Sequence, residues 1–164
     1  MEFQKLDPQT LRAHKGISFV GVTTTAICHD GAGSILMMKR GAKARDENGR
    51  WDIVGGGLKA GVPIEENIRR ELQEEICTLP KNLTFLGVRD VHRELDDGTK
   101  THWVALDFLA EVDRKKVKIG EPDVIDQIDW FRLDHLPRPL HSQFQKLVDT
   151  YRVQIEAALS PSAT

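Results

Sequence analysis

Three glutamates at close helical spacing are the residues of this sequence best suited to do chemistry. Glu71, Glu74 and Glu75 stand at positions i, i+3 and i+4, so on a helix their carboxylates share one face. Like charges at this spacing raise one another's pKa unless a cation neutralises them. Carboxylate oxygens at this density suit a hard divalent cation, Mg²⁺ or Mn²⁺. The competing interpretation is a solvated acidic helix face, which the carboxylates alone would favour.

A glycine cluster just before this segment favours a binding site over a solvated face. Gly55, Gly56 and Gly57 follow a short strand-like run that begins at Trp51. Residues without a Cβ let the backbone approach a ligand or a metal closely. The glycines and the acidic residues together therefore predict a site at the start of the helix.

An apolar stripe identifies the helix that must position the glutamates. Pro63 suits the first helical position, and Pro80 ends the segment. Between these prolines, apolar residues recur at steps of four: Ile64, Ile68, Leu72 and Ile76. This stripe would dock the helix on a core and hold the acidic face at a cleft.

In the rest of the chain, the residue patterns predict mostly strands. Runs rich in β-branched and apolar residues predict strands over 17–27, 34–39, 83–95, 100–112 and 125–131. An apolar stripe predicts a final helix over 144–159. Turn residues at 29–33 and 96–99 join two pairs of strands into hairpins. Strands and helices do not alternate regularly, which excludes a Rossmann or barrel pattern and favours an α+β fold with a mixed sheet.

The segment that begins at Gly56 resembles the Nudix box, Gly-x5-Glu-x7-Arg-Glu-U-x-Glu-Glu-x-Gly-U, in which U is aliphatic. Gly56 matches the opening glycine, and the core of the motif is matched without a gap by Arg70-Glu71-Leu72-Gln73-Glu74-Glu75. Outside the box, the hairpin that ends at Lys39-Arg40, the loop to Trp51 and a Trp-Phe-x-Leu-Asp-x-Leu-Pro segment (130–137) follow the family's order.

This resemblance implies a Nudix-type α/β/α sandwich with a mixed central β-sheet, in a single domain over residues 1–164. Residues 1–16 would form an N-terminal arm, residues 55–78 the Nudix box, and residues 160–164 a flexible tail. Because the family includes many dimers, the resemblance also allows a homodimer.

The box departs from the family pattern at three positions, which are Val62, Cys77 and Thr78. Before the box, Trp51 and Gly55-Gly56 fit the family's usual Trp-x-x-Pro-Gly-Gly segment, but Val54 stands in place of its proline. Val62 replaces a glutamate that braces the box arginine in the family. Arg70 is therefore expected to lack its usual partner, and Glu66, four residues earlier, is the candidate substitute. Since the glutamate triad is intact, tuned activity or stability is expected rather than a dead enzyme.

The resemblance further implies metal-assisted attack of water on a diphosphate linked to another moiety. It assigns catalysis to Arg70, Glu71, Glu74 and Glu75, with Gly56 and Glu121 as further metal ligands, and substrate binding to Arg40, Gly56 and Gly57. Either one of the glutamates or a downstream acid would serve as general base. Glu121 leads over Asp123, Asp126 and Asp129 because Glu121-Pro122-Asp123 is similar to a Glu-Pro-Glu segment of some MutT-like members. A plain solvated linker is the competing interpretation of this segment.

The substrate class follows from missing subfamily signatures. ADP-ribose-type members often carry a proline about fifteen residues past the box, but residues 81–120 contain none. The only tyrosine is Tyr151, so the downstream tyrosine typical of diadenosine polyphosphate hydrolases is also absent. These absences, together with the Glu121-Pro122 and Leu136-Pro137 segments, favour a resemblance to MutT-like nucleoside triphosphate diphosphatases, which release a nucleoside monophosphate and pyrophosphate. Two alternatives stay open, namely hydrolysis of a nucleotide sugar or another nucleotide derivative, and a low-turnover nucleotide-binding sensor.

Other polar and aromatic side chains carry weaker signals. His92, His102 and His135 show no metal-ligand spacing, so surface or structural roles are expected. Trp103 and Phe108 are expected in the core, although one aromatic near the cleft could stack on a base. Three basic residues near Arg40 are weaker candidates for contacting the substrate phosphates, and a solvated surface position is the competing expectation for each: Lys39, Arg45 and Arg50.

Composition excludes several classes of function. The 164 residues carry 23 basic and 25 acidic side chains, a net charge of −2, which argues against general nucleic-acid binding. No apolar run reaches the roughly 20 residues of a membrane span, and residues 1–5 show no signal peptide. Two cysteines, Cys28 and Cys77, suit a reduced, cytoplasmic protein. A polyphosphate ligand remains compatible with this charge, because cations on the acidic helix would attract it.

Overall fold

The computed structural model describes residues 7–160. Its elements in chain order are α1 (Pro8–His14), β1 (Gly21–His29), β2 (Ile35–Arg40), β3 (Trp51–Asp52), β4 (Val54–Gly57), α2 (Ile64–Ile76), β5 (Asn82–Glu94), β6 (Lys100–Glu111), β7 (Ile125–Phe131) and α3 (Phe144–Leu159). The strands and helices expected from the sequence are present, with ends displaced by up to four residues for β1.

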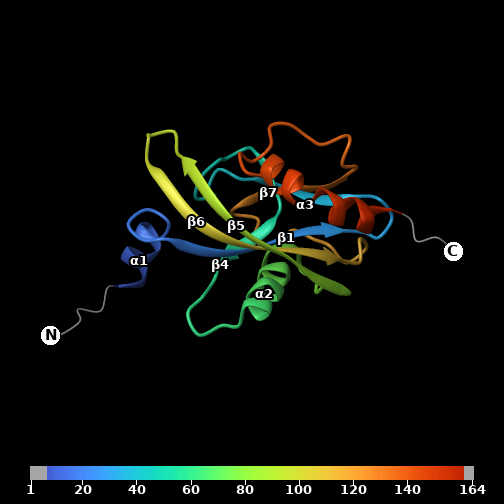
Figure 1. Cartoon of the computed structure of the whole chain (residues 1–164), viewed down its shortest axis with the longest axis horizontal. Helices are drawn as coiled ribbons and strands as arrows, with labels where there is room; N and C mark the ends of the chain where they lie inside the picture. Colours follow the sequence, from blue (N-terminus) through green and yellow to red (C-terminus); the bar gives the residue numbers. More distant parts are fainter. Residues whose placement is uncertain (1–6, 161–164) are drawn as a thin grey trace.

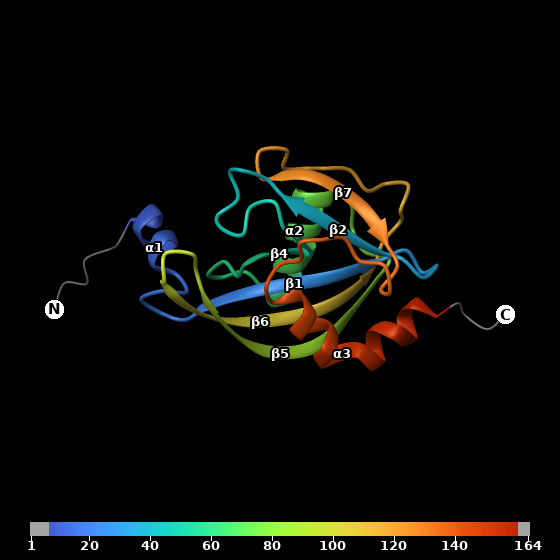
Figure 2. The same cartoon turned by 90° about the horizontal axis from the view of Figure 1, so that it is seen from above.

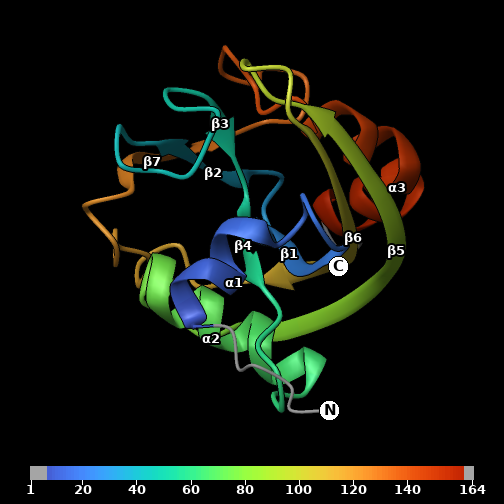
Figure 3. The same ribbon diagram turned by 90° about the vertical axis from the view of Figure 1, so that its left-hand side faces the viewer.

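The strands form one mixed sheet, as the sequence predicts. The main path runs β3-β2-β1-β6-β5, with β4 paired to β1 and β7 paired to β2. β1 and β6 are parallel, from Gly21 opposite Trp103 to His29 opposite Glu111, whereas the other pairs are antiparallel. The long strand β5 therefore lies at the end of this path, as Figure 3 shows.

Two apolar cores cover the two faces of the sheet, because side chains alternate along each strand. Ala26 and Cys28 of β1 join a core with helix α2, whereas Ile27 between them joins a core with helix α3. The two helices accordingly lie on opposite sides of the sheet (Figures 1 and 2). This arrangement confirms the α/β/α sandwich.

Helix α2 is docked by three of the four residues of its expected stripe. Ile68, Leu72 and Ile76 are fully buried, but Ile64 is 44% exposed, so its assignment to the core was wrong. A step of four residues rotates by about 40° beyond a full turn, which carries the earliest member of the stripe off the buried face. Pro63 caps the helix rather than opening it.

The helix ends at Ile76, four residues before Pro80. Cys77 adopts a left-handed conformation with φ 57° and ψ 26°, which is the usual geometry at a helix C-terminus. Glycine is the residue that adopts this conformation without strain, and it stands at this position in the Nudix pattern. Cys77 and the buried Cys28 are both free thiols, as the sequence predicts.

The chain ends extend beyond the described part. In the expected arm over 1–16, residues 7–16 contain helix α1, capped by the Asp7 carboxylate, and residues 1–6 lie outside the described residues. In the expected tail over 160–164, only Ser160 is described. Across residues 7–160, none of the helices has the length and hydropathy needed to cross a membrane.

Candidate active site

The acidic face of α2 packs against the glycine strand β4. The backbone N–H of Gly55 donates to Oε2 of Glu75 at 3.0 Å. A Cβ on Gly56 would overlap the carboxylate of Glu71, so only glycine lets β4 lie this close to the helix. Glu71 is buried, Glu74 is exposed and Glu75 is partly exposed, so the three residues differ in their access to solvent.

Burial raises the pKa of two of these carboxylates. The pKa of Glu75 lies well above its usual value because the group is desolvated, and the charges of Glu71, Glu121 and Asp52 add to the effect. Burial also raises the pKa of Glu71, against the opposing influence of Arg70. A cation would stabilise the charged forms, and an all-oxygen donor set of this kind fits a hard divalent ion.

Arg70 is held by three side chains on its own helix. It donates to Oδ1 of Asn67 at 2.9 Å and to Oε2 of Glu74 at 2.5 Å, and it also bonds Glu71. Asn67 is fully buried and donates in turn to Thr24 Oγ1 at 2.9 Å. Asn67, rather than the expected Glu66, therefore supplies the extra bond to Arg70 among the described residues. The Nε of Arg70 is buried and has no hydrogen-bond partner within residues 7–160.

Glu121 lies beside the C-terminus of α2. The N–H of Gly120 donates to the carbonyl of Glu75 at 2.9 Å, and the N–H of Lys118 donates to the carbonyl of Ile76 at 3.1 Å. The sequence did not single out Gly120. A Cβ on this residue would overlap the carbonyl of Glu74, so only glycine fits at this contact. Among the rival acids, Asp123 is exposed and pairs with Lys43 at 3.0 Å.

A cavity of about 370 Å³ opens beside the glutamates. Glu75 and the glycines of β4 line one side of it. The other walls combine acidic, basic and apolar side chains, which include Asp46, Asp52, Lys39, Arg40, Arg45, Arg89, Arg93, Ile53, Val91, Trp103, Phe144 and Leu147. This volume and mixed lining are typical of a small-molecule site.

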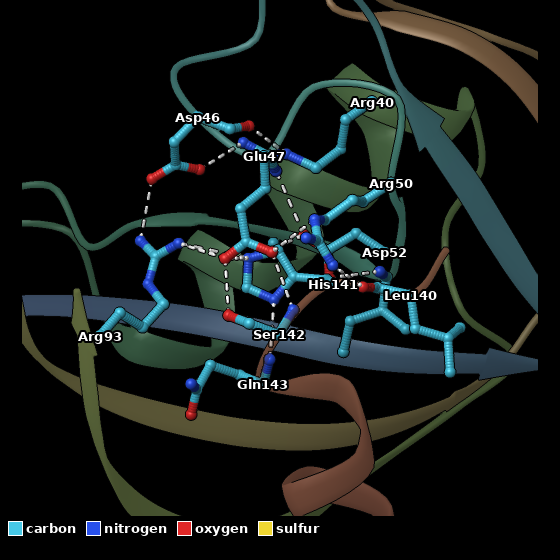
Figure 4. Close-up of polar contacts among 12 residues, drawn as sticks. Arg40, Asp46, Glu47, Arg50, Asp52, Arg93, Leu140, His141, Ser142 and Gln143 are labelled. Carbon is cyan, nitrogen blue, oxygen red and sulfur yellow. Dashed lines mark hydrogen bonds and ion pairs between the residues drawn. The ribbon is translucent and has the colours of Figure 1, made fainter. Parts of the chain in front are cut away.

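One wall of the cavity is a network of ion pairs and hydrogen bonds (Figure 4). Arg40 pairs with Asp46 at 3.0 Å and with Asp52 at 3.1 Å, and Arg93 pairs with Asp46 at 2.9 Å. Glu47 accepts from the backbone N–H of Ser142 at 2.8 Å. The network ties the loop after β2 to β5 and to the segment before α3, so the predicted binding residue Arg40 stands in a wall that already holds carboxylates.

A buried ion pair lies deeper in the sheet. Nε of Arg89 donates to Oδ2 of Asp107 at 2.6 Å, and the hydroxyl of Thr25 donates to Oδ1 at 2.7 Å. Asp107 is fully buried, and Arg89 lines the cavity. No sequence signal pointed to this pair, because the two residues meet only across the β5–β6 ladder.

Trp103 lines the cavity and is half-buried, so the expectation of core packing was wrong for this residue. The Arg45 guanidinium lies 5.3 Å from the centre of the indole ring, within the range of a cation–π contact. Arg45 is exposed, as expected, and it also lines the cavity, as does the partly exposed Lys39. Phe108 is 5% exposed and belongs to the core, as expected.

A family model described as NUDIX domain matches residues 20–151. The chain belongs to the NUDIX family. The solved MutT NUDIX hydrolase from Burkholderia pseudomallei is 30% identical and superposes with a TM-score of 0.67, over 88% of this chain and 99% of that one. The NUDIX domain of Shewanella oneidensis NrtR, solved with ADP ribose, shares the fold with a TM-score of 0.65 at 17% identity, over 92% of this chain and 99% of that one.

Curated relatives of this NUDIX chain are longer proteins. An ADP-ribose pyrophosphatase from Methanocaldococcus jannaschii is 29% identical over 71% of this chain and 64% of its own length. The NAD-capped RNA hydrolase NudC from Erwinia tasmaniensis is 26% identical over 63% of this chain and 39% of its own length. The NUDIX chain thus spans less than two thirds of each of these relatives.

Proposed function

We propose that this NUDIX chain uses a divalent cation to hydrolyse a diphosphate bond in a nucleoside diphosphate linked to another moiety. The observation that carries the proposal is the position of Glu75, which belongs to the acidic face of α2 and also lines the cavity. Arg40, Arg89 and Arg93 line other parts of the same cavity. A phosphoanhydride could therefore contact the carboxylate site while the rest of the nucleotide fills the cavity.

Each residue of the site has a proposed task. Glu71, Glu74 and Glu75 hold Mg²⁺, or Mn²⁺ in its place, with Glu121 and the Gly56 carbonyl as further oxygen ligands. In the structure that carbonyl accepts from the Thr23 hydroxyl at 2.9 Å, and Gly56 stands opposite Thr24 in the β1–β4 ladder. When bound, the cation neutralises charge on the phosphates and lowers the pKa of a bound water.

Proton transfer and orientation fall to side chains of the chain itself. Arg70 orients Glu71 and Glu74 through its direct bonds to both. One of the site carboxylates, or a downstream acid, takes the proton of the attacking water. Gly57 and Arg40 contact the substrate beside the glycine strand.

The matched test compares two glutamates of α2. Glu74→Gln removes one proposed metal ligand and should abolish Mg²⁺-dependent turnover while the circular dichroism spectrum stays unchanged. Glu66→Gln changes an exposed residue of the same helix that is not among the partners of Arg70, and it should keep full turnover. Unchanged turnover in Glu74→Gln would contradict the proposal. Nucleotide binding by the wild type without turnover would favour the sensor.

A nucleotide sugar is the substrate class that the cavity wall favours. Arg40 and Arg93 are already paired with Asp46, Asp52 and Glu47, so this wall holds nearly balanced charge. Carboxylates held in this way can accept hydrogen bonds from sugar hydroxyls, whereas a triphosphate calls for unpaired cations. The name of the Methanocaldococcus relative, an ADP-ribose pyrophosphatase, supports the same class.

A nucleoside triphosphate is the second candidate, carried by the Glu121-Pro122 segment and by the absence of proline from residues 81–120. Product analysis separates the two classes. ADP-ribose would give AMP and ribose phosphate, while a triphosphate would give a nucleoside monophosphate and pyrophosphate. A panel of both classes, compared by kcat/KM with products identified by chromatography, decides between them.

A further inference from the structure

We propose that Asp90, His92 and His102 form a second metal site, selective for a borderline transition-metal ion such as Zn²⁺. Asp90 and His92 stand two residues apart on β5, so their side chains share one face of the sheet. His102 of β6 is the residue directly opposite His92 in the antiparallel ladder. One ligand atom from each of the three residues lies within 4.8 Å of the other two.

The three side chains already lie side by side. The rings of His92 and His102 stack with centroids 4.1 Å apart and planes inclined by 27°. Nε2 of His102 lies 3.1 Å from Oδ1 of Asp90. A cation would take the place of the proton between this nitrogen and oxygen, with His92 as the third ligand.

Small movements would complete the coordination. Zinc binds imidazole nitrogen and carboxylate oxygen at about 2.0–2.2 Å, so the ligand atoms must move closer together than they now stand. The Asp90 side chain is 70% exposed and that of His102 is 39% exposed, so side-chain rotation meets little packing resistance. The exposed setting also leaves a fourth position open to water, which completes a tetrahedral site.

The donor set distinguishes this site from the carboxylate site of α2. Two imidazoles and one carboxylate suit zinc, cobalt, nickel or copper ions, whereas Mg²⁺ prefers oxygen ligands alone. The two sites therefore select different cations, and excess Mg²⁺ can occupy the glutamates while the histidine site is titrated.

The site lies on the face of β5 opposite the cavity. Arg89, Val91 and Arg93 alternate with Asp90 and His92 along the strand, and these three line the cavity. A bound ion would join β5, at the end of the sheet path, to β6. Binding should consequently stabilise the hairpin without contacting the substrate.

Calorimetric titration with Zn²⁺ in excess Mg²⁺ tests the proposal, with Co²⁺ as a spectroscopic probe. The wild type should bind one Zn²⁺ at this site, show visible absorption with Co²⁺, and melt at a higher temperature when Zn²⁺ is present. His92→Ala and His102→Ala should each weaken Zn²⁺ binding about tenfold or more, lose the thermal shift and keep Mg²⁺-dependent turnover.

His135→Ala is the matched control, because this exposed histidine lies 3.0 Å from Asp134 but outside the cluster of three. It should bind Zn²⁺ as the wild type does. Equal affinity in the wild type and in both His92→Ala and His102→Ala would overturn the proposal. So would binding that persists in these variants but disappears in Glu74→Gln or in Cys77→Ala, since those results place the ion elsewhere.

Discussion

Arg93 of β5 lies 3.0 Å from the carboxylate of Glu47, in the loop that follows β2. The same carboxylate accepts from the backbone N–H and the hydroxyl of Ser142, at 2.8 and 2.6 Å. Glu47 thus fastens three segments of the cavity wall (Figure 4). It does so from a left-handed backbone conformation with φ 48°, which costs free energy in a residue other than glycine.

Glu47→Gln should destabilise the protein at neutral pH by roughly 1–3 kcal/mol, because hydrogen bonds to a charged group are lost or weakened. Burial alone would raise the pKa of Glu47, but the bonds from Ser142, together with His141 and Arg93, outweigh it and lower the pKa below its ordinary 4.5. A lowered pKa stabilises the fold above the unfolded value, and this contribution disappears as the pH falls through the folded value.

Denaturant unfolding of both proteins between neutral and acidic pH measures this effect. The wild type and Glu47→Gln should differ most at neutral pH and converge as the pH falls below 4.5. A constant difference across that range would show that the Glu47 charge makes no contribution.

Gly56→Ala should lower turnover by about 100-fold while the fold persists, because the added Cβ would displace the Glu71 carboxylate. Steady-state kinetics with Mg²⁺ measures the loss. Gly61→Asn is the control, since nothing lies within 4 Å of a Cβ at Gly61 and asparagine tolerates its φ of 79°. Equal losses in the two variants would argue against a specific contact between Gly56 and Glu71.

Cys77→Gly should stabilise the protein by about 1 kcal/mol, since glycine adopts the left-handed conformation at the end of α2 without a Cβ penalty. Cys77→Ala keeps that penalty and should bring no comparable gain. Thermal melting of the two variants under reducing conditions makes the comparison. If both variants melt together, strain at Cys77 is not the cause of any change.

Val62→Glu should raise thermal stability or activity, because it restores the family's partner for Arg70. The Nε of Arg70 is buried without a hydrogen-bond partner among residues 7–160, and an unsatisfied donor costs about 1–3 kcal/mol. Val62→Gln tests whether the charge is needed, and Val62→Leu tests whether size alone matters. If Val62→Glu changes neither melting temperature nor kcat/KM, Asn67 already braces Arg70 fully.

The sequence by itself determined the features that depend on local spacing. Glu71, Glu74 and Glu75 share a face because a helix repeats every 3.6 residues, and Ile68, Leu72 and Ile76 set the side that docks. The role of the glycines could also be predicted, because β4 lies shortly before α2 in the sequence and the short connection keeps the two elements close together. The mixed sheet also followed from the irregular order of strands and helices.

Only the tertiary structure decided which residues meet across strands. Trp103 reaches the cavity and Arg89 meets Asp107 because of the register of β5 against β6. A turn confined to residues 96–99 would pair Leu95 with Lys100, and so His92 with Trp103, whereas the structure pairs Glu94 with Lys100 and His92 with His102. A shift of one residue reverses the face on which a side chain lies. Turn residues locate a hairpin, but packing on both sides of the sheet fixes its register.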